Sequence, residues 1–262
     1  MNLRNTGLHA VILVFAVLTM VPLAFVVNNS FRSTLELDHA FFGWPQSFKN
    51  AAALVGPALS GSSEPVTVRD NTGETRRLSA AAALRFYVAD AFDGYVRAWR
   101  VLRRYMLNSL LVCSTVALGA VLLASVTAYV LSRYRFPGSR FIFYYIISTM
   151  MFPAVLTLVP SFMLVKYLGL LNSHWALILP WIAGSQVFAI FVFKGFFDGL
   201  PEELFESARL DGAGHLQCYR HIVVPLSKPI LSVVLVMTIL GTWNNFLWPF
   251  IVNTDEKYHV VA

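Results

Sequence analysis

The stretch PEELFESARLDGAGHLQCYRHIVVPLSKP, residues 201–229, is a polar segment between two long apolar runs. Pro201 suits a first helical position, because its missing N–H would have no partner there in any case. Glu202, Glu203 and Glu206 follow it. Negative side chains in a first turn are stabilised by the positive end of the helix dipole. We therefore expect a helix to begin at Pro201.

Gly212 predicts the end of this helix, since glycine readily takes the left-handed conformation that closes many helices. A second short helix is expected over residues 214–221, with Pro225 as its stop. Glu206 and Arg209 are three residues apart and are expected to pair on the helix surface. The polar segment is thus predicted to be two short helices joined by a tight turn.

The rest of the chain is too apolar for a water-soluble domain. Of its 262 residues, 57% are hydrophobic and 13% are charged, against roughly a quarter charged in soluble domains. Five runs without Asp, Glu, Lys or Arg each exceed the ~20 residues that a helix needs to cross a bilayer. The fold class is therefore all-α, a polytopic membrane helix bundle. The runs are Thr6 to Ser30, Tyr105 to Ser132, Phe141 to Val165, Tyr167 to Phe193 and Pro229 to Thr254.

Basic residues indicate which side of the membrane each loop faces. With a cytoplasmic N-terminus, the inner loops hold the three arginines of SRYRFPGSR, while the short outer segments hold only Lys166 and Lys257. Lys and Arg collect in short cytoplasmic loops. Four arginines at positions 97–104 pull the other way, but their loop exceeds the ~60 residues over which the rule holds. We expect a multi-pass protein of the cell membrane whose N-terminus and polar segment face the cytoplasm.

The long loop between the first two runs has a structure of its own. VTVRDNTGETRRL predicts a small hairpin that turns at Asn71 to Gly73. A helix is expected from Ser79, a candidate cap, with a break at Gly94. The chain then divides into an N-terminus with the first spanning helix (1–30), a long extracytoplasmic loop (31–104) and a core transmembrane domain (105–262), with the polar loop at 195–228.

The common motifs of catalysis are absent from the sequence. No lysine follows a glycine, which excludes the phosphate-binding loop that ends in Gly-Lys-Ser/Thr. There is no His-Glu-x-x-His, Cys-x-x-Cys or Gly-x-Ser-x-Gly, and the six histidines are scattered. No basic stripe is interleaved with stacking aromatics, so nucleic-acid binding is not indicated. We expect a chain that is not itself catalytic and that binds no metal or cofactor.

The apolar runs do contain proline and amide side chains. Broken helices often line a cavity within a bundle, and a buried amide is costly unless it has a partner or water. Hydrogen bonding between helices is the simpler explanation for any one of these side chains. The candidates for a translocation pathway are Gln186, Trp243, Asn244 and Asn245.

ESARLDGAGHLQCYRHIVVP resembles the EAA loop of permease subunits of binding-protein-dependent ABC importers. That pattern is Glu-Ala-Ala, three residues, Gly, nine residues and Ile-x-Leu-Pro. Here Ser207 replaces an alanine and Val224 a leucine. The matching residues are Glu206, Ser207, Ala208, Gly212, Ile222 and Pro225.

Four further segments resemble the carbohydrate branch of this family, and specifically its maltose-permease-like second subunits. They are NSLLV at Asn108, AYVLSRYRFPGSR at Ala128, MMFPAVLTLVPSFMLVKYLGLLNS at Met150 and WNNFLWPF at Trp243. The resemblance implies a transmembrane permease subunit of an ATP-driven importer of a sugar or oligosaccharide. It implies four partners besides the bilayer: a second permease, two ATP-binding subunits and an extracytoplasmic solute-binding protein.

The resemblance also implies how ATP use is coupled to transport. The EAA loop would sit in a cleft of a cytoplasmic ATPase, with Glu206, Ala208, Asp211 and Gly212 as contact and turn residues. ATP would be hydrolysed by the partner subunits.

Two features depart from the family. The loop between the first two runs is longer than usual, and the sequence ends at NTDEKYHVVA, where family members continue into a sixth spanning helix. We expect this helix to be missing by truncation. Two alternatives stay open: a permease of the same type for polyamines, metals or anions, and a membrane anchor that recruits a cytoplasmic partner without transport.

Overall fold

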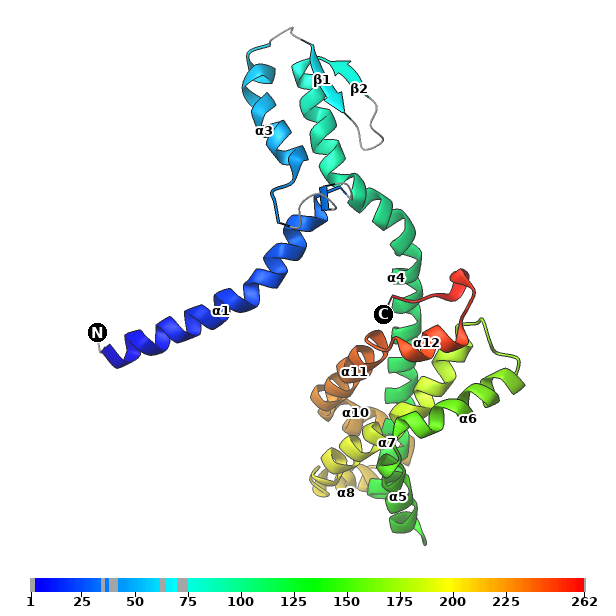
Figure 1. Cartoon of the computed structure of the whole chain (residues 1–262). Coiled ribbons are helices and arrows are strands. Elements are labelled where there is room, and N and C mark those ends of the chain that lie inside the picture. Colours follow the sequence, from blue (N-terminus) through cyan, green and yellow to red (C-terminus); the bar gives the residue numbers. More distant parts are fainter. Residues whose placement is uncertain (1–2, 34–35, 38–41, 62–64, 70–74, 262) are drawn as a thin grey trace. The chain divides into compact units, whose positions relative to one another are not determined.

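The computed structural model describes the chain except residues 1–2, 34–35, 38–41, 62–64, 70–74 and 262. The described residues form many helices and one two-stranded sheet (Figure 1), which confirms the all-α class. The chain divides into two compact units, Met1–Val101 and Leu102–Ala262.

The first unit contains a long apolar helix, α1 (Leu3–Ser30), and a shorter one, α3 (Gln46–Leu59). Strands β1 (Val66–Arg69) and β2 (Thr75–Leu78) pair antiparallel, with Val66 opposite Leu78. The predicted hairpin is confirmed in its strands, whereas its turn at residues 71–73 lies outside the described residues.

Helix α4 (Ala80–Arg133) begins in the first unit and ends in the second. The Ala83 N–H donates to the Ser79 carbonyl over 2.8 Å, so the helix starts where the sequence predicts. The predicted break at Gly94 is wrong, because α4 continues through it. A helical glycine costs only about 1 kcal/mol relative to alanine, which the neighbouring helical residues can offset.

In the second unit, the third apolar run is broken rather than straight. It forms α5 (Ser139–Ser148), a 3-10 turn η1 (Thr149–Met151) and α6 (Ala154–Tyr167), with a bend of 104° between the two halves. Phe152 is extended because the ring of Pro153 disfavours a helical residue before it. The bend therefore falls at one of the prolines that interrupt the apolar runs, and the pair can still count as one span.

Helix α7 (Trp175–Asp198) runs through Pro180 and packs against α5, α11 and α12. Small residues of α4, Ala124 and Ala128, share a buried cluster with Phe193 and Phe197 of α7. Small side chains let helices approach closely where lipid offers no hydrophobic driving force. The two helices are also close at Gly119 of α4, where an added Cβ would lie 2.7 Å from the Ile182 Cδ1 atom.

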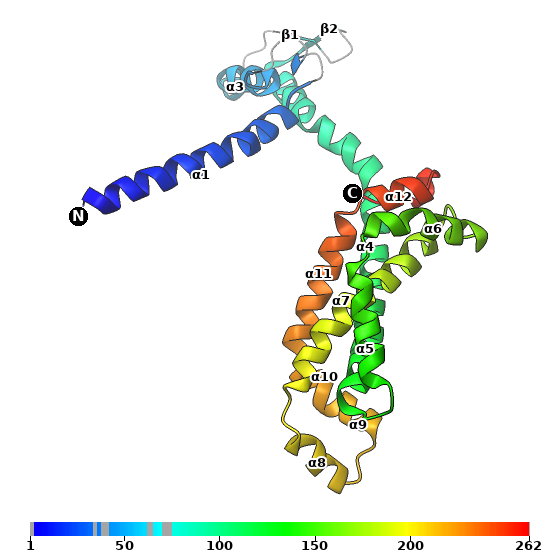
Figure 2. The same cartoon turned by 60° about the horizontal axis from the view of Figure 1, so that its bottom comes forward.

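The polar segment follows α7 as a series of short elements. Figure 2 shows α8 at one end of the second unit and α12 toward the other. The elements are α8 (Glu203–Leu210), α9 (His215–Cys218), a π-helical turn η2 (Tyr219–Val223), α10 (Val224–Leu226), α11 (Lys228–Trp243), α12 (Leu247–Val252) and a 3-10 turn η3 (Glu256–Tyr258).

Pro225 does not stop the second short helix, contrary to the prediction. The chain stays helical through Leu226 and bends by 77° before α11 begins at Lys228. A proline ring collides with the carbonyl four residues earlier in a regular helix. The π-helical turn directly before Pro225 is wider, and it accommodates the ring without ending the helix.

Five membrane spans are consistent with these helices. Among the described residues, α1, α4 and α7 are each long and apolar enough to cross a membrane. The bent pairs α5–α6 and α9–α11 pass the same test only when each is counted as one span. The predicted run Pro229 to Thr254 lies over two helices, α11 and α12.

Candidate functional site

The turn at Gly212 closes α8 in a Schellman motif. The Ala213 N–H donates to the Ala208 carbonyl over 2.8 Å, and the Gly212 N–H donates to the Arg209 carbonyl over 3.0 Å. This six-to-one and five-to-two pattern requires a left-handed residue, and Gly212 has φ +83°. The predicted turn is confirmed, and its backbone carbonyls are satisfied without a side-chain cap.

Phe205 and Arg133 fix α8 to the spanning helices. Phe205 is buried, and the Arg133 guanidinium lies over its ring, 4.1 Å from the centroid. Arg133 also donates to the carbonyls of Phe197, over 2.5 Å, and Leu200, over 2.8 Å. Because Arg133 ends α4 and the two carbonyls lie at the end of α7, one side chain joins three helices.

Glu202 completes this connection. Its carboxylate accepts from Arg133 Nη1 over 2.6 Å and from Arg209 Nη2 over 2.5 Å. The predicted pair of Glu206 with Arg209 is therefore wrong. Arg209 reaches the residue just before the helix, because Glu202 is already held there by Arg133. Charge-assisted contacts of this kind are stronger than neutral hydrogen bonds.

The second half of the segment is fixed by side chains of α4. Tyr129 donates to the His215 carbonyl over 3.2 Å, and Ser125 and Tyr219 share a hydroxyl hydrogen bond of 2.7 Å. At the start of α9, Gln217 accepts from the Gly214 N–H over 2.7 Å. Both short helices are therefore attached to the end of α4.

The opposite face of the segment is open. Ala208 and Ile222 are half-buried and line a surface hollow of about 290 Å³ together with Asp211 and Gly212. Among the predicted coupling residues, the exposed side chains are those of Glu206, Ser207, Asp211 and Pro225. The sequence-predicted coupling residues thus lie on one short segment, whose other side is packed on α4 and α7.

Leu210 and Leu216 flank this open face, and the sequence analysis did not identify them. Leu210 is 90% exposed and Leu216 is also exposed. An apolar side chain on an otherwise polar loop between spanning helices was the available signal. Arg133 was noted only as a basic residue of an inner loop, since nothing in the sequence connects it to Glu202.

The four pathway candidates do not form one group. Gln186 lies within α7, where its amide donates to the Ala120 carbonyl of α4 over 3.4 Å and to the Ile182 carbonyl over 3.0 Å.

The other three candidates lie at the end of α11. Trp243 ends α11, and Asn244 and Asn245 follow it. The Asn245 side chain accepts from the Trp248 N–H over 3.3 Å and so begins α12.

Gln186 and α12 lie at different positions along the axis of α7. The Trp248 indole of α12 donates to the Ala176 carbonyl over 3.0 Å. Gln186 comes ten residues after Ala176 in the same helix, which is about 15 Å along its axis. Gln186 already has protein partners, as the simpler explanation for a buried amide requires.

Asn108 and Asn172 organise the end of the unit that carries α12. Asn108 donates to the carbonyls of Lys257, over 3.0 Å, and His259, over 2.8 Å. The Asn172 side chain accepts from the N–H groups of Thr254 and Asp255. Ser109 accepts from the Val261 N–H over 2.7 Å. Asn108 and Ser109 of the NSLLV segment, together with Asn172, therefore hold residues 254–261 against the bundle.

His174, next to this tie, has an altered pKa. Its ring lies edge-on to the Tyr258 ring, with 5.2 Å between centroids. Burial lowers the pKa of His174, and the nearby Lys257 charge lowers it further. No group of three or more metal-ligating side chains occurs among the residues that the structure describes.

Comparison with known proteins agrees with this architecture. The family described as "Binding-protein-dependent transport system inner membrane component" matches residues 120–257, which include every coupling residue predicted above. The diacetylchitobiose uptake system permease protein of Streptomyces coelicolor is 30% identical over 256 residues, 97% of this chain and 71% of that protein.

A second relative and one solved structure are similar over different extents. The sn-glycerol-3-phosphate transport system permease protein of Salmonella typhi is 37% identical over 150 residues, 57% of this chain and about half, 53%, of its own length. A bacterial ABC transporter involved in the import of the acidic polysaccharide alginate has the same fold, with a TM-score of 0.68 at 19% identity over 97% of this chain and 76% of that chain. On the family match and the full-length relative together, the chain belongs to the binding-protein-dependent transport system inner membrane components, the permease subunits of ABC importers.

Proposed function

We propose that this chain is a permease subunit of a sugar importer and forms half of its solute pathway. The relative that matches almost the whole chain is named for uptake of diacetylchitobiose, a carbohydrate. The Salmonella typhi relative named for sn-glycerol-3-phosphate matches 57% of this chain. The extent of the first match favours a sugar or oligosaccharide over a small anion.

We propose further that Glu203–Leu210 and the turn after it form the segment that contacts a cytoplasmic ATPase. The observation that carries this proposal is the contrast between its two faces. One face is joined to α4 and α7 through Arg133 and Phe205, and the other presents Glu206, Asp211 and Leu210 to the surroundings. A short amphipathic helix of this kind suits a groove on a protein partner.

The remaining partners follow from this assignment. The complex would contain a second permease, two ATP-binding subunits that hydrolyse ATP, and an extracytoplasmic solute-binding protein. The N-terminus would be cytoplasmic, as the basic residues of the short loops favour. This chain would bind no cofactor itself, and the proposed pathway side chains remain Gln186, Trp243, Asn244 and Asn245.

Charge reversal at Glu206 tests the coupling assignment. In the reconstituted complex, Glu206→Lys should abolish solute uptake and solute-stimulated ATP hydrolysis, because it would place a cation where the partner groove expects an anion. Gly212→Pro should do the same by breaking the turn. Glu256→Lys, also exposed but in η3 near the opposite end of the unit, is the matched control and should keep both activities. Unchanged uptake in Glu206→Lys would show that the segment is not the coupling site.

The solute is identified by binding measurements on the partner solute-binding protein. We expect tighter binding of a disaccharide than of glycerol phosphate or a polyamine. A preference for either of the latter would favour the alternative permease types.

A further inference from the structure

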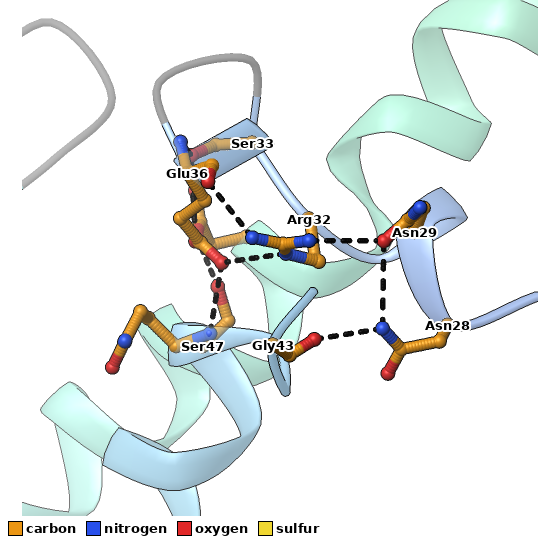
Figure 3. Close-up of polar contacts among 9 residues, drawn as sticks. Asn28, Asn29, Arg32, Ser33, Glu36, Gly43 and Ser47 are labelled. Atoms are coloured by element: carbon orange, nitrogen blue, oxygen red, sulfur yellow. Dashed lines mark hydrogen bonds and ion pairs between the residues drawn. The ribbon is translucent and has the colours of Figure 1, made fainter. Parts of the chain in front are cut away.

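The chain that leaves α1 is tied back onto the end of that helix by polar side chains (Figure 3). Asn28 donates to the Gly43 carbonyl over 2.7 Å. The Arg32 side chain, only 2% exposed, donates to the Asn29 side chain over 3.0 Å and to the Glu36 carbonyl over 2.8 Å. The Glu36 carboxylate accepts from the Gln46 N–H over 3.0 Å. These bonds fix residues 42–48 beside the last turns of α1.

Two phenylalanines of this segment pack against aromatic side chains, one in α1 and one directly after it. The Phe42 ring lies 5.3 Å from the Phe25 ring, and the Phe48 ring lies 5.1 Å from the Phe31 ring. Phe42 is nevertheless 77% exposed and Trp44 is 74% exposed. Between them and α1 is an open hollow of about 970 Å³. None of the described residues that line it is charged.

The depth of this hollow follows from the length of the span. Val11–Ser30 has 20 residues, about 30 Å of helix, which is the thickness of the hydrocarbon layer. Phe25 comes five residues before Ser30 and therefore lies about 7 to 8 Å inside that end. Phe42, which contacts Phe25, must lie at a similar depth. Interfacial segments bury their apolar face about 5 to 10 Å into the boundary of headgroups and acyl chains.

We propose that Phe42–Phe48 is a membrane-interface anchor, and that phospholipid acyl chains occupy the hollow between it and α1. The hollow is continuous with the surface of α1, whose apolar window has none of its residues buried within the chain. A water-soluble partner could not reach this depth without entering the bilayer. Trp44 has the amphipathic ring that collects at membrane interfaces. The proposal does not depend on the identity of the solute.

Depth-dependent fluorescence quenching tests this proposal in the complete transporter. The complex is placed in nanodiscs of phospholipid brominated either high in the acyl chain or near its end. The emission of Trp44 is obtained as the difference between the unmodified complex and Trp44→Phe, a conservative change at an exposed position. We expect bromine high in the chain to remove most of this difference emission, with a smaller loss from bromine near the chain end and little loss from aqueous iodide.

Two other outcomes would overturn the proposal. Quenching of Trp44 by iodide and not by brominated lipid would show that the segment lies in water. Protection from both quenchers would show that a protein subunit, such as the second permease, covers the hollow instead of lipid.

Discussion

Gly212 carries the turn of the proposed coupling segment through its backbone alone. No atom lies within 4 Å of a Cβ added there, so Gly212→Ala would meet no steric clash beyond its own positive φ. A left-handed residue other than glycine costs about 1 to 2 kcal/mol. We expect the Ala213 amide, which closes the turn, to exchange its hydrogen about 5- to 30-fold faster.

Gly195→Ala in α7 is the matched control for this change. Its added Cβ also meets nothing within 4 Å, but Gly195 does not have a positive φ. There the substitution should leave the exchange of Ala213 unchanged. Equal exchange rates in both variants would contradict the conformational role of Gly212.

Arg133 is the residue whose loss should separate ATP use from transport. Arg133→Ala leaves Glu202 and two carbonyls without their shared donor, and it exposes one face of Phe205. Hydrogen bonds to charged groups are worth about 1.5 to 3 kcal/mol each. We expect α8 to become mobile relative to α4, so that less solute moves per ATP hydrolysed.

The ratio of uptake to ATP hydrolysis in proteoliposomes measures this effect. Arg135→Ala, at an exposed position two residues later, should keep the ratio of the unmodified complex. A normal ratio in Arg133→Ala would remove Arg133 from the coupling route.

These residues show what a sequence can and cannot predict at this scale. Gly212 was predictable, because a left-handed helix end follows from local chemistry. The partner of Arg209 was not, because Glu202 is held in place by Arg133, a residue 69 positions away in the chain.

Among the secondary-structure elements, Pro153 and Pro225 affect their helices differently. Pro153 separates α5 from α6 because Phe152 before it is extended. Pro225 lies inside a continuing helix because a π-helical turn precedes it. The sequence identifies both positions as irregular, but packing against neighbouring helices decides which one breaks the chain.

Residues 253–261 should respond to pH through His174. Burial and Lys257 hold the pKa of His174 below its ordinary value of 6.5. When residues 253–261 detach, His174 becomes solvated, and it then takes up a proton more readily than when the segment is docked. The stabilisation is present above pH 6.5 and is lost as the pH falls toward the lowered pKa.

Hydrogen exchange at residues 253–261, corrected for the intrinsic pH dependence, measures this loss. We expect increased opening of the segment on acidification, and His174→Gln should make opening nearly independent of pH. Opening that decreases in acid would mean that the charged form of His174 is the docked one.

At the scale of the whole molecule, composition alone established a membrane helix bundle. Three of the five charge-free runs overlap continuous helices and the other two overlap bent pairs, since hydropathy locates apolar segments but not bends within them. The hairpin strands and the start of α4 were also predictable from local pattern. The joining of α4, α7 and α8 was not, because it depends on contacts between residues far apart in the chain.

Site-directed cross-linking in the assembled complex can show whether α8 and its turn contact the ATPase. Cys113 and Cys218 are buried, so background reaction should be low. A cysteine at Leu210, 90% exposed, should form a disulfide with a cysteine introduced along the surface groove of the ATP-binding subunit. A cysteine at Tyr167, 88% exposed at the end of α6, should not. Cross-linking of the ATPase at Tyr167 but not at Leu210 would show that the ATPase binds at the α6 end and not at α8.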